Sequence, residues 1–170
     1  MKKTIIDLFE DSVVKYGAKT FLLEKKHRAF EPTTYAETRE QALETGAGLA
    51  AAGIRPGDKV AILSEGCNAW ITSELGVFYA GAVSVPLSVK LEESNDLLFR
   101  MRHAEVRALF VSKYQLSKIR RIRAELPQVE HIIVIGHTPL EAGETALGTL
   151  RRMGRDYLAA NREEFLAIGR

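Results

Sequence analysis

The sequence has one cysteine, Cys67, among its 170 residues. A single cysteine excludes an internal disulfide framework and a zinc site built from several cysteines, and it is typical of a reducing compartment. The chain also has little net charge, because 24 basic side chains face 22 acidic ones and leave a formal charge of +2. This balance gives no indication of a nucleic-acid or anionic-membrane partner.

Long apolar runs are missing too, since the longest fall well short of the roughly 20 residues that a membrane-spanning helix needs. The first 17 residues carry acidic side chains where a signal peptide would have its apolar region. We therefore expect no transmembrane segment and a cytoplasmic location.

Phosphate-binding and metal-binding motifs are absent from the sequence. There is no GxxxxGK[ST] loop, no Ser/Thr/Gly-rich run that could surround a triphosphate, and no metal-ligand spacing. Residues 46–53, GAGLAAAG, contain three glycines but fall inside or at the end of a predicted helix. A dinucleotide loop instead follows a strand and directs a helix N-terminus at the phosphates, so we do not expect one here.

A strand-helix-strand unit at residues 60–87 is the clearest pattern that is present. Residues 60–63 are apolar without polar alternation, which is typical of a strand buried on both faces of a parallel sheet. Asn68 is the expected N-cap of the helix, and Gly81 is its expected end. The apolar stripe of that helix comprises Trp70, Ile71, Leu75 and Phe78.

Further strands are expected to start at residues 108 and 131, so that the four starts (60, 83, 108 and 131) are 23–25 residues apart. This is the period of βα units in a doubly wound sheet, and with 46% hydrophobic residues the chain can bury a real core. We predict an α/β fold, a Rossmann-like and mostly parallel sheet with helices on both faces. We expect one α/β unit over residues 1–136 and a polar, mainly helical tail without a further strand over residues 137–170.

The first 53 residues predict an N-terminal helix, a β-hairpin and a second helix. Thr4 and Asp7 are placed as a capping pair for the first helix, and Thr34 and Glu37 as a capping box for the second. The segments 20–24 and 29–35 form the expected hairpin, which lies outside the main sheet. A second capping box, Ser112 with Gln115, is expected before the helix that follows residue 111.

Three groups of side chains are candidate functional sites. Cys67 follows a strand and precedes a helix, where hydrolases place a nucleophile, but none of the histidines His27, His103, His131 and His137 is positioned as its base. The basic residues of the helix near residue 119 are expected to form a solvated face, with an anion-binding patch as the alternative; they are Lys113, Lys118, Arg120, Arg121 and Arg123. The carboxylates Glu92, Glu93 and Asp96 are expected to open a helix rather than perform acid-base chemistry.

The order of motifs resembles the N-terminal region of the adenylate-forming (AMP-binding) enzymes, which include acyl-CoA synthetases, peptide-synthetase adenylation domains and luciferases. The resemblance rests on Tyr-Ala-Glu at residues 35–37, Gly-Asp-x-Val-Ala-Ile at 57–62, Trp70, and Ala-Gly-Ala-Val-x-x-Pro-Leu at 80–87. Residues 97–119 are most similar to the long-chain fatty acyl-CoA ligase branch. The resemblance extends to about residue 135 and is weak beyond it.

The resemblance implies an ATP-dependent ligase that joins a fatty carboxylate to AMP and then transfers the acyl group to coenzyme A, with Mg²⁺ neutralising phosphate charge. The phosphate loop and the later motifs of that family do not occur in these residues, and the tail would lead toward that loop. The resemblance therefore gives no catalytic, cofactor-binding or metal-binding residue in this chain. It implies an inactive N-terminal part whose partner is the remainder of the same polypeptide, and whose uncovered surfaces could self-associate.

Two other interpretations stay open. The chain could be a free-standing α/β binding or regulatory module without catalysis, or a small hydrolase that depends on Cys67. An in-frame phosphate loop after residue 170 would favour the ligase, and a stop codon would favour the module.

Overall fold

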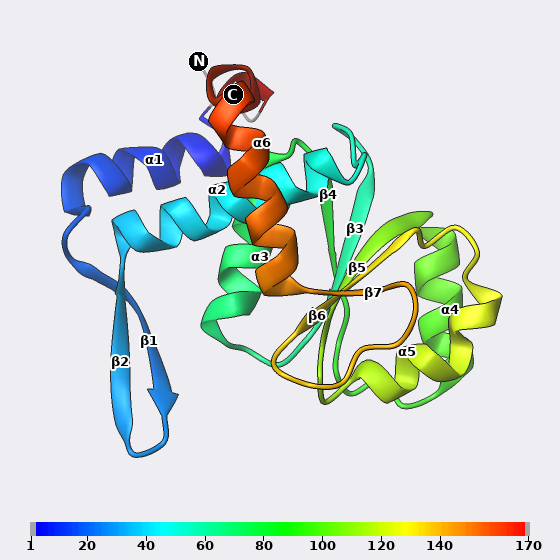
Figure 1. Ribbon diagram of the computed structural model, residues 1–170. Helices are drawn as coiled ribbons and strands as arrows, with labels where there is room; N and C mark the ends of the chain where they lie inside the picture. The colour runs from blue at the N-terminus through cyan, green and yellow to red at the C-terminus, as the bar shows by residue number, and fades with distance from the viewer. Residues whose placement is uncertain (1–2, 169–170) are drawn as a thin grey trace.

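The computed structural model describes residues 3–168, which form an α/β unit with an N-terminal arm (Figure 1). The helices are α1 (Ile5–Tyr16), α2 (Tyr35–Ala51), α3 (Asn68–Tyr79), α4 (Ser94–His103), α5 (Leu116–Ile122), the short 3₁₀ helix η1 (Arg123–Glu125) and α6 (Leu147–Ile168). The strands are β1 (Thr20–Lys26), β2 (Ala29–Thr34), β3 (Lys59–Leu63), β4 (Val83–Pro86), β5 (Val106–Ser112), β6 (His131–Ile135) and β7 (Glu144–Ala146).

The main sheet has five strands in the order β4-β3-β5-β6-β7, and every neighbouring pair is parallel. From β3 the chain passes through α3 to β4 on one side, and then through α4 to β5 on the other side of β3. This reversal makes the fold doubly wound, as the spacing of the strands predicts.

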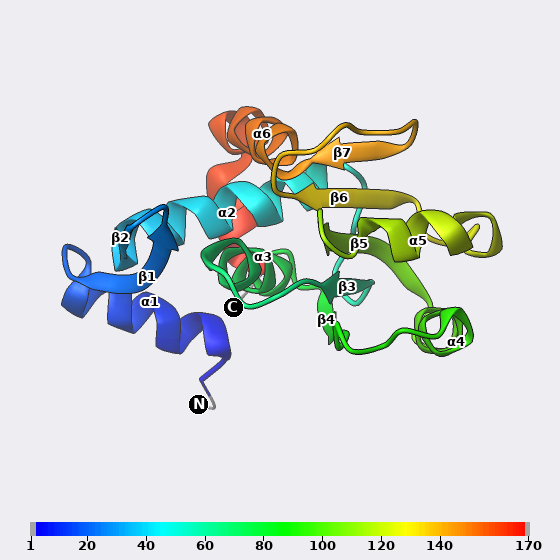
Figure 2. The ribbon, with the colours of Figure 1, turned by 90° about the horizontal axis from the view of Figure 1, so that it is seen from below.

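Helices cover both faces of this sheet, which confirms the predicted layers (Figure 2). Successive residues of β3 alternate between two cores: Val60 and Ile62 pack with α2, α3 and α6, whereas Ala61 and Leu63 pack with α4 and α5. All four side chains have 0% exposure. The unbroken apolar run is therefore explained by burial on both sides of the strand.

The prediction that no strand follows residue 136 is wrong. β7 pairs in parallel with β6 through Ile132–Glu144, Ile133–Thr145 and Val134–Ala146, so the sheet has a fifth strand. A strand of three residues with the sequence Glu-Thr-Ala is too short for a period of two to be recognised. The strand is held by its pairing with β6 and by the ion pair between Glu144 and Arg120.

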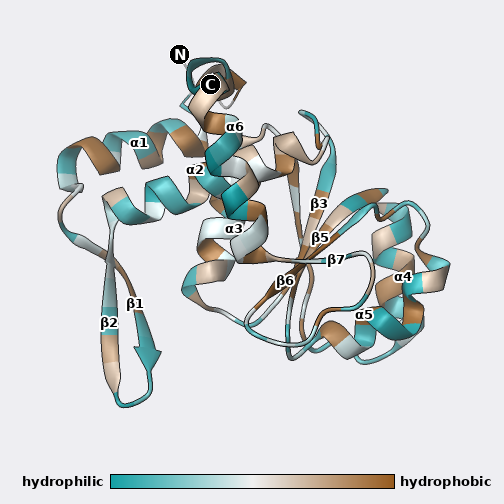
Figure 3. Ribbon diagram, in the orientation of Figure 1, coloured by the Kyte–Doolittle hydropathy of each residue, from teal (hydrophilic) through white to brown (hydrophobic). Residues whose placement is uncertain are grey.

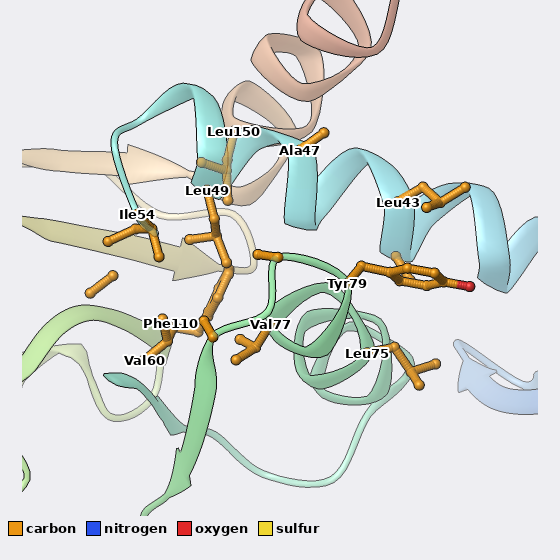
Figure 4. Close-up of a cluster of buried hydrophobic side chains, with 14 of the residues drawn as sticks. Leu43, Ala47, Leu49, Ile54, Val60, Leu75, Val77, Tyr79, Phe110 and Leu150 are labelled. Carbon is orange, nitrogen blue, oxygen red and sulfur yellow. The ribbon is translucent and has the colours of Figure 1, made fainter. Parts of the chain in front are cut away.

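Close packing of α2 against α3 and α6 explains two of the three glycines in residues 46–53 (Figure 4). A Cβ added at Gly46 would lie 2.5 Å from the carbonyl oxygen of Gly76 in α3, and one at Gly48 would lie 2.3 Å from that of Leu150 in α6. Gly154 in α6 is tighter still, at 1.8 Å from the carbonyl oxygen of Glu44. Gly46, Gly48 and Gly154 therefore allow three helices to approach one another. Gly53 lies just after α2 with a φ of 91°, at the end of the helix as predicted.

Helix α6 belongs to the larger core, since Leu150, Leu158 and Phe165 are buried in it. The helix bends at Asn161, whose φ of −130° is not helical and whose Nδ2 donates to the Tyr157 carbonyl oxygen at 3.0 Å. The bend lets Phe165, at 1% exposure, reach the core. The helical content of the tail is confirmed, while the boundary at residue 136 stays a prediction.

The N-terminal arm forms as the capping signals predict. Thr4 with Asp7 and Thr34 with Glu37 both complete capping boxes, in which each side chain bonds to the backbone of the other. The hairpin β1–β2 is a separate two-stranded sheet with His27 and Arg28 at its tip.

Two predicted caps are wrong. The N-cap of α3 is Cys67 rather than Asn68, because Asn68 already has helical backbone and uses its side chain on Thr33 of the hairpin. The capping box of Ser112 with Gln115 does not form, because Gln115 is itself the N-cap of α5 and its side-chain amide donates to Glu65 instead. Both polar side chains form tertiary hydrogen bonds instead of capping their own helices.

Within residues 3–168, no helix is long and apolar enough to cross a membrane.

Candidate functional site

The carboxyl ends of β3 and β5 form the topological switch point of the sheet, where ligands bind in many open α/β folds. Ser64 and Glu65 follow β3, and Ser112 ends β5 with Gln115 shortly after it. The Gln115 amide bridges the two strand ends, since its Nε2 donates to Glu65 Oε1 at 2.6 Å. This switch point is the position at which the fold predicts a ligand site.

Glu65 stays ionised at this switch point. Burial disfavours its charged form, but the polar groups of Ser112 and Gln115 outweigh that effect, so the pKa of Glu65 is lowered. The buried Ser112 hydroxyl lies near enough to contribute but makes no hydrogen bond of ordinary geometry within the described residues. A carboxylate held here repels phosphate, so the switch point has the wrong charge for a nucleoside triphosphate.

Cys67 is partly exposed in the turn between β3 and α3. The structure shows no hydrogen bond from its sulfur to any group in residues 3–168, and a thiol nucleophile needs a base that takes its proton. His27 lies at the hairpin tip and His103 stacks on Phe99 with 5.6 Å between ring centroids. The geometry provides no Cys-His pair.

Lys118 contradicts the prediction of a solvated basic face. Its side chain is buried, and its Nζ donates to the carbonyl oxygens of Val89 (2.9 Å) and Leu91 (3.1 Å) and to Glu92 Oε1 (2.9 Å). The ammonium thus holds the loop between β4 and α4 against α5. This role depends on a loop almost thirty positions away in the sequence, so helical periodicity around residue 118 could not reveal it.

Arg120 is also held rather than solvated. Its guanidinium makes a bidentate pair with Glu144 of β7, at 2.8 and 2.7 Å, and donates to the Pro139 carbonyl oxygen at 3.0 Å. Glu141 is a further ion partner at 3.3 Å. These bonds hold the edge strand β7 in place and lower the pKa of Glu144, mainly through the hydrogen bonds from Arg120.

The other basic residues of this region do not converge into an anion site. Lys113 lies over the ring of Tyr114, with Nζ 5.0 Å from the centroid, and Arg123 donates to the Leu126 carbonyl oxygen at 2.8 Å. Arg121 is exposed. With Lys118 and Arg120 occupied by carboxylates and carbonyls, the structure gives no support to an anion-binding patch.

The carboxylates near residue 93 open α4, as predicted. Glu93 is its N-cap and Asp96 lies in its first turn, where negative charge complements the helix dipole. Glu92 pairs with Lys118 instead. Residues 3–168 hold no group of three or more His, Cys, Asp or Glu side chains that could bind a metal ion.

A polar network that the sequence did not reveal joins α1, α2 and α3. Tyr79 is 2% exposed and donates from its hydroxyl to Glu10 Oε1 at 2.6 Å, while Arg39 Nε contacts both oxygens of Glu10 at 2.9 and 2.8 Å. Burial and the bond to Glu10 raise the pKa of Tyr79. The phenol therefore stays protonated, and the network acts as a structural bridge between the arm and the core.

Arg151 forms a second bridge, from α6 to α2 and α3. It donates to Thr45 Oγ1 at 3.1 Å and to Thr72 Oγ1 at 2.6 Å, and both threonines have 0% exposure. Burial lowers the pKa of Arg151, although an arginine remains charged at physiological pH. Both bridges join helices.

Residues 9–163 match the family model described as "AMP-binding enzyme". Among curated proteins, the chain is 29% identical over 145 residues to a long-chain-fatty-acid–CoA ligase of Thermus thermophilus, covering 84% of this chain and 27% of that protein. It is 28% identical over 109 residues to a chloroplastic long-chain-fatty-acid–[acyl-carrier-protein] ligase of Arabidopsis thaliana, covering 64% of this chain and 15% of that protein. The chain thus spans only a small part of the curated relatives it matches.

Among solved structures, the fold is similar to an anthranilate CoA ligase in complex with anthranoyl-AMP, with a TM-score of 0.79 and 28% identity over 86% of this chain and 27% of that one. A putative long-chain-fatty-acid CoA ligase of Rhodopseudomonas palustris shares the fold with a TM-score of 0.78 at 19% identity, over 87% of this chain and 36% of that one.

Proposed function

Because the chain belongs to the family of AMP-binding enzymes, we propose that it is the N-terminal part of an acid-thiol ligase that adenylates a carboxylic acid with ATP and passes the acyl group to coenzyme A. The observation that carries this proposal is the family match over residues 9–163, nearly the whole chain, combined with a coverage of only 27% of the Thermus thermophilus ligase. One domain of a larger enzyme accounts for both.

Long-chain fatty acids are the substrate class that we propose. The Thermus thermophilus and Arabidopsis thaliana relatives are both described as ligases of long-chain fatty acids, and they match different lengths of this chain. The structural relative with anthranoyl-AMP acts on an aromatic acid, so a panel of acids is needed to decide the class. We place the protein in the cytoplasm.

The part of the chain that the structure describes, residues 3–168, shows no set of groups that fits ATP or its Mg²⁺. The switch point carries the ionised Glu65, and the cations of Lys118 and Arg120 are already bonded to protein oxygens. Adenylation needs preorganised donors around a polyphosphate, and the loss of one such donor costs about 10²-fold or more in known sites. We derive no catalytic step from this chain. Its proposed role is structural, as a folded unit against which the rest of the enzyme packs.

The test is ATP-pyrophosphate exchange that depends on an added carboxylic acid. We expect no exchange above background from the 170-residue chain, and exchange with long-chain fatty acids when the chain is extended by the residues that follow it in its reading frame. Anthranilate, benzoate and short fatty acids serve as comparison substrates. Exchange by the short chain would overturn the assignment of an inactive part, and an extended protein that exchanges with none of the acids would overturn the ligase.

A further inference from the structure

The hairpin β1–β2 is a sheet of its own, and Figure 1 shows it projecting away from the parallel sheet. A two-stranded hairpin is marginally stable in water without further packing. Its attachment to the core is at its base, where Phe21 packs against Phe9 and Tyr35 with ring centroids 5.7 and 4.4 Å apart. This aromatic packing stabilises the base, so the outer half of the hairpin depends on other contacts.

The two faces of the hairpin differ in what covers them. One face carries the pairs Leu22–Thr33 and Glu24–Glu31, and it turns toward α3, because Asn68 donates from its backbone to Glu24 Oε1 at 3.1 Å and from Nδ2 to Thr33 Oγ1 at 3.3 Å. Side chains alternate along a strand, so the pairs Leu23–Pro32 and Lys25–Phe30 lie on the opposite face.

That opposite face, which we call the outer hairpin face, consists of Leu23, Lys25, Phe30 and Pro32. Leu23 is 61% exposed and Phe30 is 65% exposed, and Pro32 and Lys25 are exposed as well. Figure 3 shows an apolar segment in β2 next to the polar tip of the hairpin. Adjacent exposed apolar side chains of this size mark a surface that contacts something.

The charge around this face is basic. Lys26 pairs with Glu31 at 2.7 Å, whereas Lys25 and Arg28 have no ion partner within residues 3–168. A partner that fits this surface has an apolar centre for Leu23 and Phe30 and carboxylates at its rim for Lys25 and Arg28.

We propose that the outer hairpin face docks on a further domain of the same polypeptide, on an apolar surface with an acidic rim. The inference rests on the proposed function, in which this chain is one part of a ligase, and relatives several times its length match it. A second copy of the chain is the weaker occupant, because a stable complex of free proteins buries about 1,200–2,000 Å² and the outer hairpin face offers three apolar side chains. A linked domain needs less area, since the linkage keeps its effective concentration in the millimolar range.

The first measurement is amide hydrogen exchange in β1 and β2, compared between the 170-residue chain and the same chain extended by the residues that follow it in its reading frame. We expect exchange at least tenfold slower in the extended protein. The variant Leu23→Ser/Phe30→Ser should return the hairpin of the extended protein to the rates of the short chain. The matched control is Val14→Ser/Phe99→Ser, which removes an aliphatic and an aromatic side chain that are 87% and 66% exposed on α1 and α4, and it should keep the slow exchange.

Three outcomes would overturn the proposal: hairpin exchange that does not slow on extension, slow exchange that survives Leu23→Ser/Phe30→Ser, or exchange in the short chain that slows as its concentration rises, which would assign the face to a second copy. ATP-pyrophosphate exchange on the same samples separates this proposal from the proposed function. A protected hairpin in a protein inactive with every acid would uphold docking and sink the ligase. An active ligase with an unprotected hairpin would do the reverse, and a stop codon directly after Arg170 would overturn both.

Discussion

The parallel sheet and the hairpin differ in how their side chains are covered. In β3 and β5, Ile62 and Phe110 have 0% exposure between two helical layers, whereas in the hairpin Leu23 and Phe30 are more than 60% exposed. The sheet is closed by helices on both faces, and the hairpin is held by its base and by Asn68. The comparison indicates that most of the stability of this chain comes from the sheet and its helices. The hairpin can unfold locally while the sheet stays folded.

The comparison is most sharply tested by the same substitution in both sheets. Phe110→Ala should lower the free energy of unfolding by about 3–5 kcal/mol, because it empties a site closed on both faces. Phe30→Ala should change it by less than about 0.5 kcal/mol, since the ring is largely in water. Urea denaturation monitored by circular dichroism measures both, and similar losses at the two positions would show that the hairpin is an equal part of the cooperative unit.

The close contact of α2 and α6 gives the next largest effect. Gly154→Ala should cost about 3 kcal/mol, because the new Cβ would lie 1.8 Å from the Glu44 carbonyl oxygen and the two helices would have to separate. Gly148→Ala in the same helix is the matched control, since nothing lies within 4 Å of a Cβ there. It should be neutral or stabilising by up to about 1 kcal/mol, because alanine is the better helix former. Equal stability of the two variants would contradict the close approach.

An ion pair in each region gives a smaller, pH-dependent effect. The folded pKa of Glu144 is lowered by Arg120, so the pair contributes stability above the pKa of the unfolded carboxyl, about 4.3, and that contribution is lost as the pH falls through the folded pKa. Glu144→Gln should therefore be less stable than the wild type near neutral pH and should approach it below about pH 4.

The hairpin pair serves as the comparison. Lys26 and Glu31 have side chains that are 54% and 53% exposed, and exposed pairs of this kind contribute little. Glu31→Gln should follow the wild type at every pH in denaturation midpoints measured from pH 3 to 7. A difference between Glu144→Gln and the wild type that does not change with pH would rule out the ionised pair as its cause.

Left-handed backbone provides the smallest effect, and again one example lies in each region. Glu105 follows α4 with a φ of 53°, and His27 lies at the hairpin tip with a φ of 54°. A left-handed residue other than glycine costs about 1–2 kcal/mol, of which the greater chain entropy of glycine cancels part. Glu105→Gly should raise the free energy of unfolding by about 0.5–1 kcal/mol. His27→Gly should leave the global midpoint unchanged, and an equal gain from it would show that the hairpin unfolds together with the sheet.

Local signals were sufficient for most of the fold. The capping boxes at Thr4 and Thr34 and the apolar runs at residues 60, 108 and 131 each depend on residues within one turn or one strand. For that reason the sequence predicts the four strands of the βα units and the helices on both faces of the sheet. The candidate sites were harder to predict, because the fate of Lys118 and Arg120 depends on a loop and a strand that a helical pattern does not contain.

By itself the sequence determined the α/β class, the order of the βα units, the separate hairpin and the resemblance to the adenylate-forming enzymes, because each is encoded in local periodicity or in short motifs. Only the tertiary structure decided that Glu144 begins a fifth strand, that Gly46, Gly48 and Gly154 serve helix packing, and that Lys118 and Arg120 are bonded within the protein. Each of these depends on atoms far apart in the chain. A three-residue strand or a buried ammonium is stable only when it contacts a partner that is distant in the sequence. The residues next to it in the sequence do not identify that partner.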